Sequence, residues 1–197
     1  MNIRSKAFLS FLVNLVFAIY NFVLGFASFS WWFAFVGAYY IVLSIMRIAV
    51  IAFSSKNRQS EKFIMKFSGV MIFMLSIVLC GIVYMTIDGD GAIKYHEIAM
   101  ITIALYAFTK LTLAIIGVVN SKKNNRPYVK TLRSIAFADA VVSIYSLQRS
   151  MLVSFEGMTA HDIILFNTLS GIGMCIIVVC IGLNLIIGGK KIWQNQN

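Results

Sequence analysis

The sequence predicts an all-α, polytopic membrane protein in which residues 1–197 form a single transmembrane domain, a bundle of six transmembrane helices. Composition is the first reason. Of the 197 residues, 60% are hydrophobic and 12% are charged, and the mean hydropathy is +0.86. Soluble domains have about 45–50% apolar and about 25% charged residues. The second reason is that the apolar residues fall in six long runs, and the third is that basic residues gather in alternate loops.

The six apolar runs cover about 7–28, 31–53, 65–87, 95–119, 134–155 and 160–187. Each reaches the roughly 20 residues that a helix needs to cross the hydrocarbon core at about 1.5 Å per residue. The first run is longer than the apolar part of a secretion signal, and no small-residue cleavage site precedes Trp31. We therefore expect it to be retained as the first helix.

The distribution of charge predicts the topology. Basic residues occupy four segments, one before the first run and one after each of the second, fourth and sixth runs. The positive-inside rule places these segments, and with them both termini, in the cytoplasm. This topology explains the net charge of +10 without a nucleic-acid partner. The Ile, Lys and Asn usage is typical of an AT-rich bacterial genome, so we expect a bacterial inner membrane.

The chain also has a 65-residue periodicity. Three helical hairpins cover roughly 4–58, 62–124 and 130–192, and their returning helices begin at Trp31, His96 and His161. One explanation is a triplication, with three hairpins around a pseudo-threefold axis along the membrane normal. The other is that bilayer thickness alone sets a repeat of about 60 residues in any protein with six spans and short loops.

Three charged residues lie within the cytoplasmic half of the predicted bilayer. Lys110 is about 15 Å from the cytoplasmic end of its run, Arg47 about 10 Å and Asp139 about 9 Å at the usual helical rise. A buried carboxylate without a partner costs about 2.5–3.5 kcal/mol or more. We therefore expect Asp139 to pair with Lys110 or Arg47. For Arg47 the alternative is a side chain that extends to the cytoplasmic headgroups.

The interior charges predict a ligand. Arg149 lies toward the outer face with Tyr145 one turn away, so the interior of the predicted bundle, away from the ends of the runs, holds three bases and one acid. A shared cavity with this excess would attract a carboxylate, a phosphate or a lipid headgroup. The alternative is a structural ion pair plus two bases that extend to the interfaces. The candidate binding residues are Lys110, Arg47, Asp139, Arg149, Tyr106 and Tyr145.

Other polar residues in the runs have two interpretations, because each can line this interior or join helices by hydrogen bonds. They are Asn14, Asn21, Thr109, Thr112, Gln148 and Asn167.

A metal site is a weaker hypothesis. His96 with Glu97 and His161 with Asp162 recur at the outer mouth, and imidazoles with carboxylates can hold a divalent metal. Neither pair has the i,i+4 spacing of a helical metal site. Acids at helix starts, near the positive end of the dipole, explain both pairs without a metal. We expect no metal, no cofactor and, since no catalytic motif is found, no enzymatic activity.

The sequence therefore predicts a small multi-pass transporter, channel or substrate-binding subunit whose cavity favours an anionic small molecule or lipid headgroup. The alternative is an accessory or scaffold membrane protein that moves no solute. In that case its partners are lipid, another membrane subunit or a second copy of the chain.

Overall fold

The computed structural model describes parts of 11–26 and then residues 31–53, 58–87, 97–121, 127–154 and 157–194. Within these ranges, every residue outside 157–159 is helical, as are the described residues between Phe11 and Phe26. The prediction of an all-α chain is therefore confirmed. The helices are α2 (Trp31–Phe53), α3 (Arg58–Ile87), α4 (Glu97–Ser121), α5 (Pro127–Ser154) and α6 (Ala160–Gln194).

Three helices continue seven residues beyond the apolar runs of the sequence. α3 begins at residue 58, where the run begins at 65; α5 begins at 127 instead of 134; and α6 ends at 194 instead of 187. The added turns are rich in polar and basic residues. Pro127 occupies the first position of α5, where the missing N–H of proline costs no hydrogen bond.

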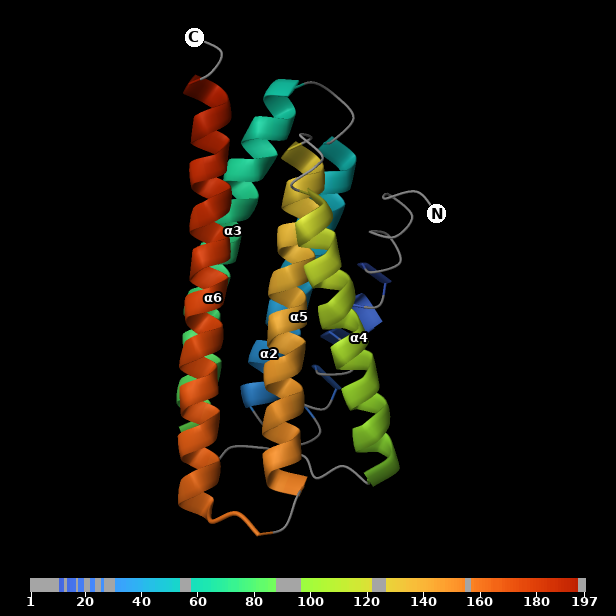
Figure 1. Ribbon diagram of the computed structural model, residues 1–197, viewed down its shortest axis with the longest axis vertical. Helices are drawn as coiled ribbons and strands as arrows, with labels where there is room; N and C mark the ends of the chain where they lie inside the picture. The colour runs from blue at the N-terminus through green and yellow to red at the C-terminus, as the bar shows by residue number, and fades with distance from the viewer. Residues whose placement is uncertain are drawn as a thin grey trace.

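Successive helices run antiparallel (Figure 1). The Phe53 end of α2, the Arg58 start of α3, the Ser121 end of α4, the Pro127 start of α5 and the Gln194 end of α6 lie at one end of the bundle. We call this the basic end, because these helix termini adjoin the basic segments of the sequence.

Three helices are long and apolar enough to cross a membrane. They contain Ala34–Phe53, Phe63–Thr86 and Ala160–Gly188. In α4 the apolar helical stretch among described residues is shorter, Ala107–Asn120. The hydropathy of α5 is lowered by Asp139, Arg149 and several hydroxyl residues. These findings make the chain compatible with membrane insertion through α2, α3 and α6.

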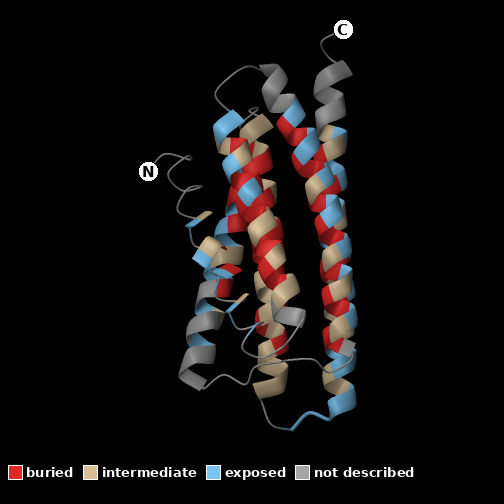
Figure 2. Ribbon diagram, turned by 180° about the vertical axis from the view of Figure 1, so that it is seen from behind, coloured by how far each residue is buried: buried red, intermediate tan, exposed pale blue. Residues whose placement is uncertain are grey.

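The most polar of these helices, α5, lies in the middle of the bundle. It packs against α2, α3, α4 and α6. Its buried residues are spread around the helix rather than along one stripe, and Figure 2 shows them beside half-buried ones over most of its length. A helix that is enclosed on several sides keeps its polar groups away from lipid. In a membrane protein, polar groups cost least in the interior of the bundle.

Apolar side chains cover the outer surface. On α6 the exposed ones include Leu165, Leu169, Ile172, Ile176 and Ile187. A continuous apolar surface of this kind is unfavourable in water and favourable in lipid.

The closest helix contact joins α3 and α6. A Cβ at Gly69 would lie 3.0 Å from the carbonyl oxygen of Gly182, and a Cβ at Gly182 would lie 3.1 Å from the carbonyl oxygen of Gly69. Small residues let two backbones approach in this way, which is how helices pack tightly in lipid. Farther along the same pair, a Cβ at Gly171 would lie 2.6 Å from Val83.

Replacing Gly182 by alanine should therefore destabilise the protein by about 1–3 kcal/mol, because the new methyl group forces the α3 backbone away. Thermal unfolding of the detergent-solubilised chain measures this change. Gly173→Ala is the matched control, since a Cβ at Gly173 meets nothing within 4 Å. It should be neutral or slightly stabilising. Equal losses in the two variants would contradict the proposed role of the contact.

Candidate functional site

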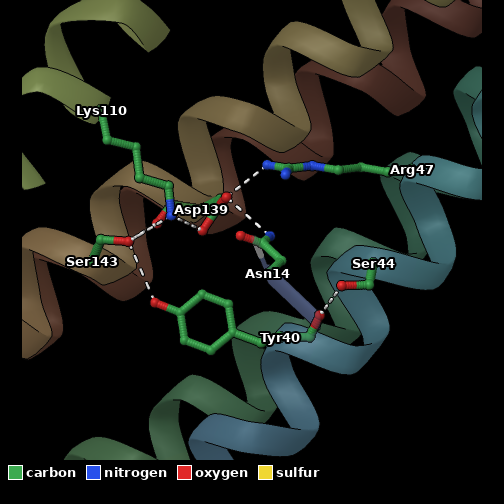
Figure 3. Close-up of polar contacts among 7 residues, drawn as sticks. All are labelled: Asn14, Tyr40, Ser44, Arg47, Lys110, Asp139 and Ser143. Atoms are coloured by element: carbon green, nitrogen blue, oxygen red, sulfur yellow. Dashed lines mark hydrogen bonds and ion pairs between the residues drawn. The ribbon is translucent and has the colours of Figure 1, made fainter. Parts of the chain in front are cut away.

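The centre of the bundle holds a carboxylate with three nitrogen donors (Figure 3). Asp139 Oδ1 accepts a hydrogen bond from Lys110 Nζ at 2.6 Å. Asp139 Oδ2 accepts from Arg47 Nη2 at 2.6 Å and from Asn14 Nδ2 at 3.0 Å. The expected pairing of Asp139 is confirmed, and both candidate bases take part. We call Asn14, Tyr40, Arg47, Lys110, Asp139 and Ser143 the charged junction.

Four helical segments supply the charged junction. Asn14 comes from the first segment, Arg47 from α2, Lys110 from α4 and Asp139 from α5. On α2, helical spacing places Arg47 in a buried stripe with Tyr40, Leu43 and Val50, and burial of this stripe carries the arginine into the bundle.

Ser143 and Tyr40 hold Lys110 from other sides. The Ser143 hydroxyl donates to the backbone carbonyl oxygen of Asp139 at 2.9 Å, and its oxygen accepts from Lys110 Nζ at 3.0 Å. Because that hydroxyl has one proton, the 3.3 Å contact with Tyr40 is donated by the Tyr40 hydroxyl. Lys110 Nζ also lies 5.7 Å from the centre of the Tyr40 ring, a cation–π distance. The ammonium group is thus oriented by three neighbouring side chains.

Burial differs among the three charges. The side chains of Asp139 and Arg47 are 0% and 2% exposed, whereas that of Lys110 is 17% exposed. The alternative interpretation, in which Arg47 extends to the headgroups, is therefore wrong. The physical reason is that a buried carboxylate binds the guanidinium more strongly than the interface does. Two cations and one carboxylate leave this group with one surplus positive charge, and Lys110 is its most accessible member.

Tyr145 and Arg149 lie elsewhere. The Tyr145 hydroxyl is 3.4 Å from Thr86 Oγ1 of α3 and lies beside Gly171 of α6. Arg149 is buried one turn farther along α5. Tyr145 therefore faces α3 and α6, whereas Asp139 faces α2 and α4. Tyr145 bonds away from the charged junction, Arg149 lies ten residues beyond Asp139 on α5, and the Tyr106 side chain lies outside the described part of the chain.

The remaining polar candidates divide between the two interpretations. Asn14 joins the junction, whereas Gln148 Nε2 donates to Ser170 Oγ at 2.8 Å and so joins α5 to α6. Thr109 and Thr112 are exposed and donate to carbonyl groups of their own helix. Asn167 is buried on α6. Asn21 falls outside the described residues.

The outer histidine and acid pairs have a simpler role where they are described. Asp162 belongs to the N-terminal cap of α6. Its carboxylate accepts from the Thr159 hydroxyl at 2.6 Å, and its backbone N–H donates to Thr159 Oγ1 at 3.2 Å. His161 is exposed. His96 and the side chain of Glu97 lie outside the described part. Among described residues, no group of three or more His, Cys, Asp or Glu side chains could hold a metal ion.

Sequence reasoning missed Ser143 and Tyr40 as members of the junction. The position of Ser143, four residues after Asp139 on a helix, is the signal that could have found it, because such residues share a face. Tyr40 had a weaker signal, because it lies seven residues before Arg47 on the same face of α2, whereas its hydrogen bond is to Ser143 on another helix.

Comparison with known proteins gives no family. No protein-family model matches the chain, and no curated protein is significantly similar to it.

The geometry predicts the effect of removing the central carboxylate. Asp139→Asn leaves Arg47 and Lys110 facing each other in a buried site, so it should cost about 3–5 kcal/mol of unfolding free energy. Adding Lys110→Met should recover part of this loss, because it removes one of the two facing cations. Denaturant titration in detergent measures both changes.

Thr112→Val is the control. Thr112 is an exposed residue of α4, the helix of Lys110, and its hydroxyl donates to the backbone carbonyl oxygen of Phe108 in that helix. This substitution should change stability by no more than about 0.5 kcal/mol. If the losses from Asp139→Asn and Lys110→Met simply add, the two side chains are not coupled.

Proposed function

We propose that the chain is a small six-span protein of a bacterial inner membrane that transports or captures an anionic solute or lipid headgroup at Lys110. The single observation that carries this proposal is the surplus positive charge of the Arg47–Lys110–Asp139 group, with Lys110 as its most exposed member. A cation deep in a bilayer is costly, so its presence indicates a structural or a ligand-binding role.

The six-span architecture is supported by helix length and direction. All of α2 to α6 have 23 or more residues, enough for a hydrocarbon core of about 30 Å. The alternation of helix directions is the one that six spans require (Figure 1). The arrangement of three hairpins around a threefold axis stays a prediction.

The junction suggests how an anion is bound. An incoming carboxylate or phosphate oxygen replaces Asp139 Oδ1 or Ser143 Oγ at the Lys110 ammonium group. During this exchange Asp139 Oδ2 keeps its bonds to Arg47 and Asn14, so the displaced carboxylate remains paired within the bundle. The desolvation penalty of a lone buried charge is thereby avoided, and exchange at Lys110 is the least costly route.

Lys110→Met should strongly reduce this activity and leave the fold intact, because the Arg47–Asp139 ion pair is neutral on its own. In proteoliposomes, uptake of small carboxylates and phosphate esters should fall roughly tenfold or more, the value of one charge-assisted hydrogen bond. Thr112→Val, which keeps Lys110, should transport as the unmodified chain does. Uptake that is unchanged in Lys110→Met contradicts the proposal.

One observation favours the alternative, an accessory or scaffold membrane protein. Both carboxylate oxygens of Asp139 are already bonded within the bundle, as in a network that serves only stability. In that case no anion is transported and no anion raises the melting temperature of the purified chain. Chemical cross-linking in native membranes then captures a defined membrane subunit.

The proposed topology has its own test. In a chain whose three native cysteines are replaced by alanine, Gly91→Cys and Gly157→Cys should react with an impermeant maleimide added to whole cells. Asn57→Cys and Asn125→Cys should react only after the membrane is opened, because they lie in the basic loops. The reverse pattern would overturn the positive-inside assignment.

A further inference from the structure

Two basic side chains at the start of α5 lie in notches made by glycines of neighbouring helices. Lys130 Nζ is 3.3 Å from the point where a Cβ of Gly188 would lie on α6, and Met65 Cε of α3 is 2.5 Å from the same point. Arg133 packs against Gly117 of α4, and its Cδ is 2.9 Å from the point where a Cβ of Gly117 would lie. Both side chains are half-buried. We call these two places the glycine notches.

The notches place the two charges at the edge of the apolar layer. Gly117 lies four residues before the end of α4, and Gly188 six residues before the end of α6. Lys130 Nζ lies against Gly188, and the guanidinium group and Cδ of Arg133 lie against Gly117, where a larger residue would exclude them. Their charged groups lie near the C-terminal ends of helices, which carry partial negative charge.

The described structure offers these charges no carboxylate. Neither Lys130 nor Arg133 forms an ion pair with a carboxylate of the described residues. The sequence of this end is also strongly basic, because residues 54–66, 120–133 and 188–197 contain Glu61 as their single acid. The basic residues of the three segments are Lys56, Arg58, Lys62, Lys66, Lys122, Lys123, Arg126, Lys130, Arg133, Lys190 and Lys191.

We propose that each glycine notch is a binding place for the phosphate group of an anionic phospholipid at the cytoplasmic interface, with Lys130 as the phosphate contact beside α6 and Arg133 as the contact beside α4. Arginine and lysine are the side chains that bind phosphate best. Basic pockets between helices at this depth are where acidic lipid headgroups bind.

A lipid fits these notches better than free phosphate does, because apolar surface adjoins them. The residues that precede the two glycines, Ile187 on α6 and Ile116 on α4, are exposed apolar side chains. Acyl chains can cover these side chains while the phosphate stays at the interface. This inference rests on the proposed orientation of the basic end and does not depend on anion transport at Lys110.

The test is lipid binding to the purified full-length chain, by native mass spectrometry and by melting temperature. Phosphatidylglycerol should be retained and should raise the melting temperature, whereas phosphatidylcholine with the same acyl chains should do neither. Lys130→Gln and Arg133→Gln should each weaken retention of phosphatidylglycerol about fivefold. Lys66→Gln is the control, because Lys66 is an exposed lysine of the same end and does not lie in a notch.

Three results would overturn the inference. The first is equal retention of the two lipids by the unmodified chain, a measurement that needs no variant to fold. The second is a loss in Lys66→Gln as large as that in Lys130→Gln, which would indicate a diffuse surface potential. The third is the same rise in melting temperature with inorganic phosphate alone, which would indicate a general anion site.

Discussion

One carboxylate determines how this bundle is assembled. Asp139 has no access to water, so each of its oxygens needs a donor, and the donors come from three other helical segments. A charged group in an apolar interior is costly unless it is fully paired. The need to satisfy Asp139 therefore brings the first segment, α2 and α4 to the same side of α5. Apolar packing alone, which lacks direction in lipid, would not specify this arrangement.

The position of α5 follows from the same constraint. It carries Asp139, Ser143, Gln148 and Arg149, and these side chains contact or face different neighbours around the helix. A helix with polar groups on several sides is stable in lipid only when other helices enclose it. The helix with the weakest membrane signal in the sequence is thus the one at the centre. The helices with the strongest signal, α3 and α6, present apolar side chains to the outside.

The sequence was sufficient for features that depend on local composition. The helical class, the apolar runs and the pairing of Asp139 all follow from hydropathy, helical rise and the cost of a lone charge. It was not sufficient where the answer depends on which helix faces which. The burial of Arg47, the contact of Gly69 with Gly182 and the contact of Tyr145 with Thr86 require the tertiary arrangement. Neither rise per residue nor depth in the bilayer determines the direction of a side chain around its helix.

The two basic residues of the junction are not equivalent, and this asymmetry bears on function. Arg47 and Asn14 share one oxygen of Asp139 inside the bundle, while Lys110 bonds to the other from a partly exposed position. A guanidinium is always charged and bonds in a fixed planar geometry, whereas an ammonium group on a flexible stem can exchange one acceptor for another. The arginine therefore suits the permanent half of the ion pair. The lysine suits a contact that is made and broken. In the function that we propose, an anion bound at Lys110 would leave the Arg47–Asp139 pair, and with it the packing of α2 against α5, unchanged.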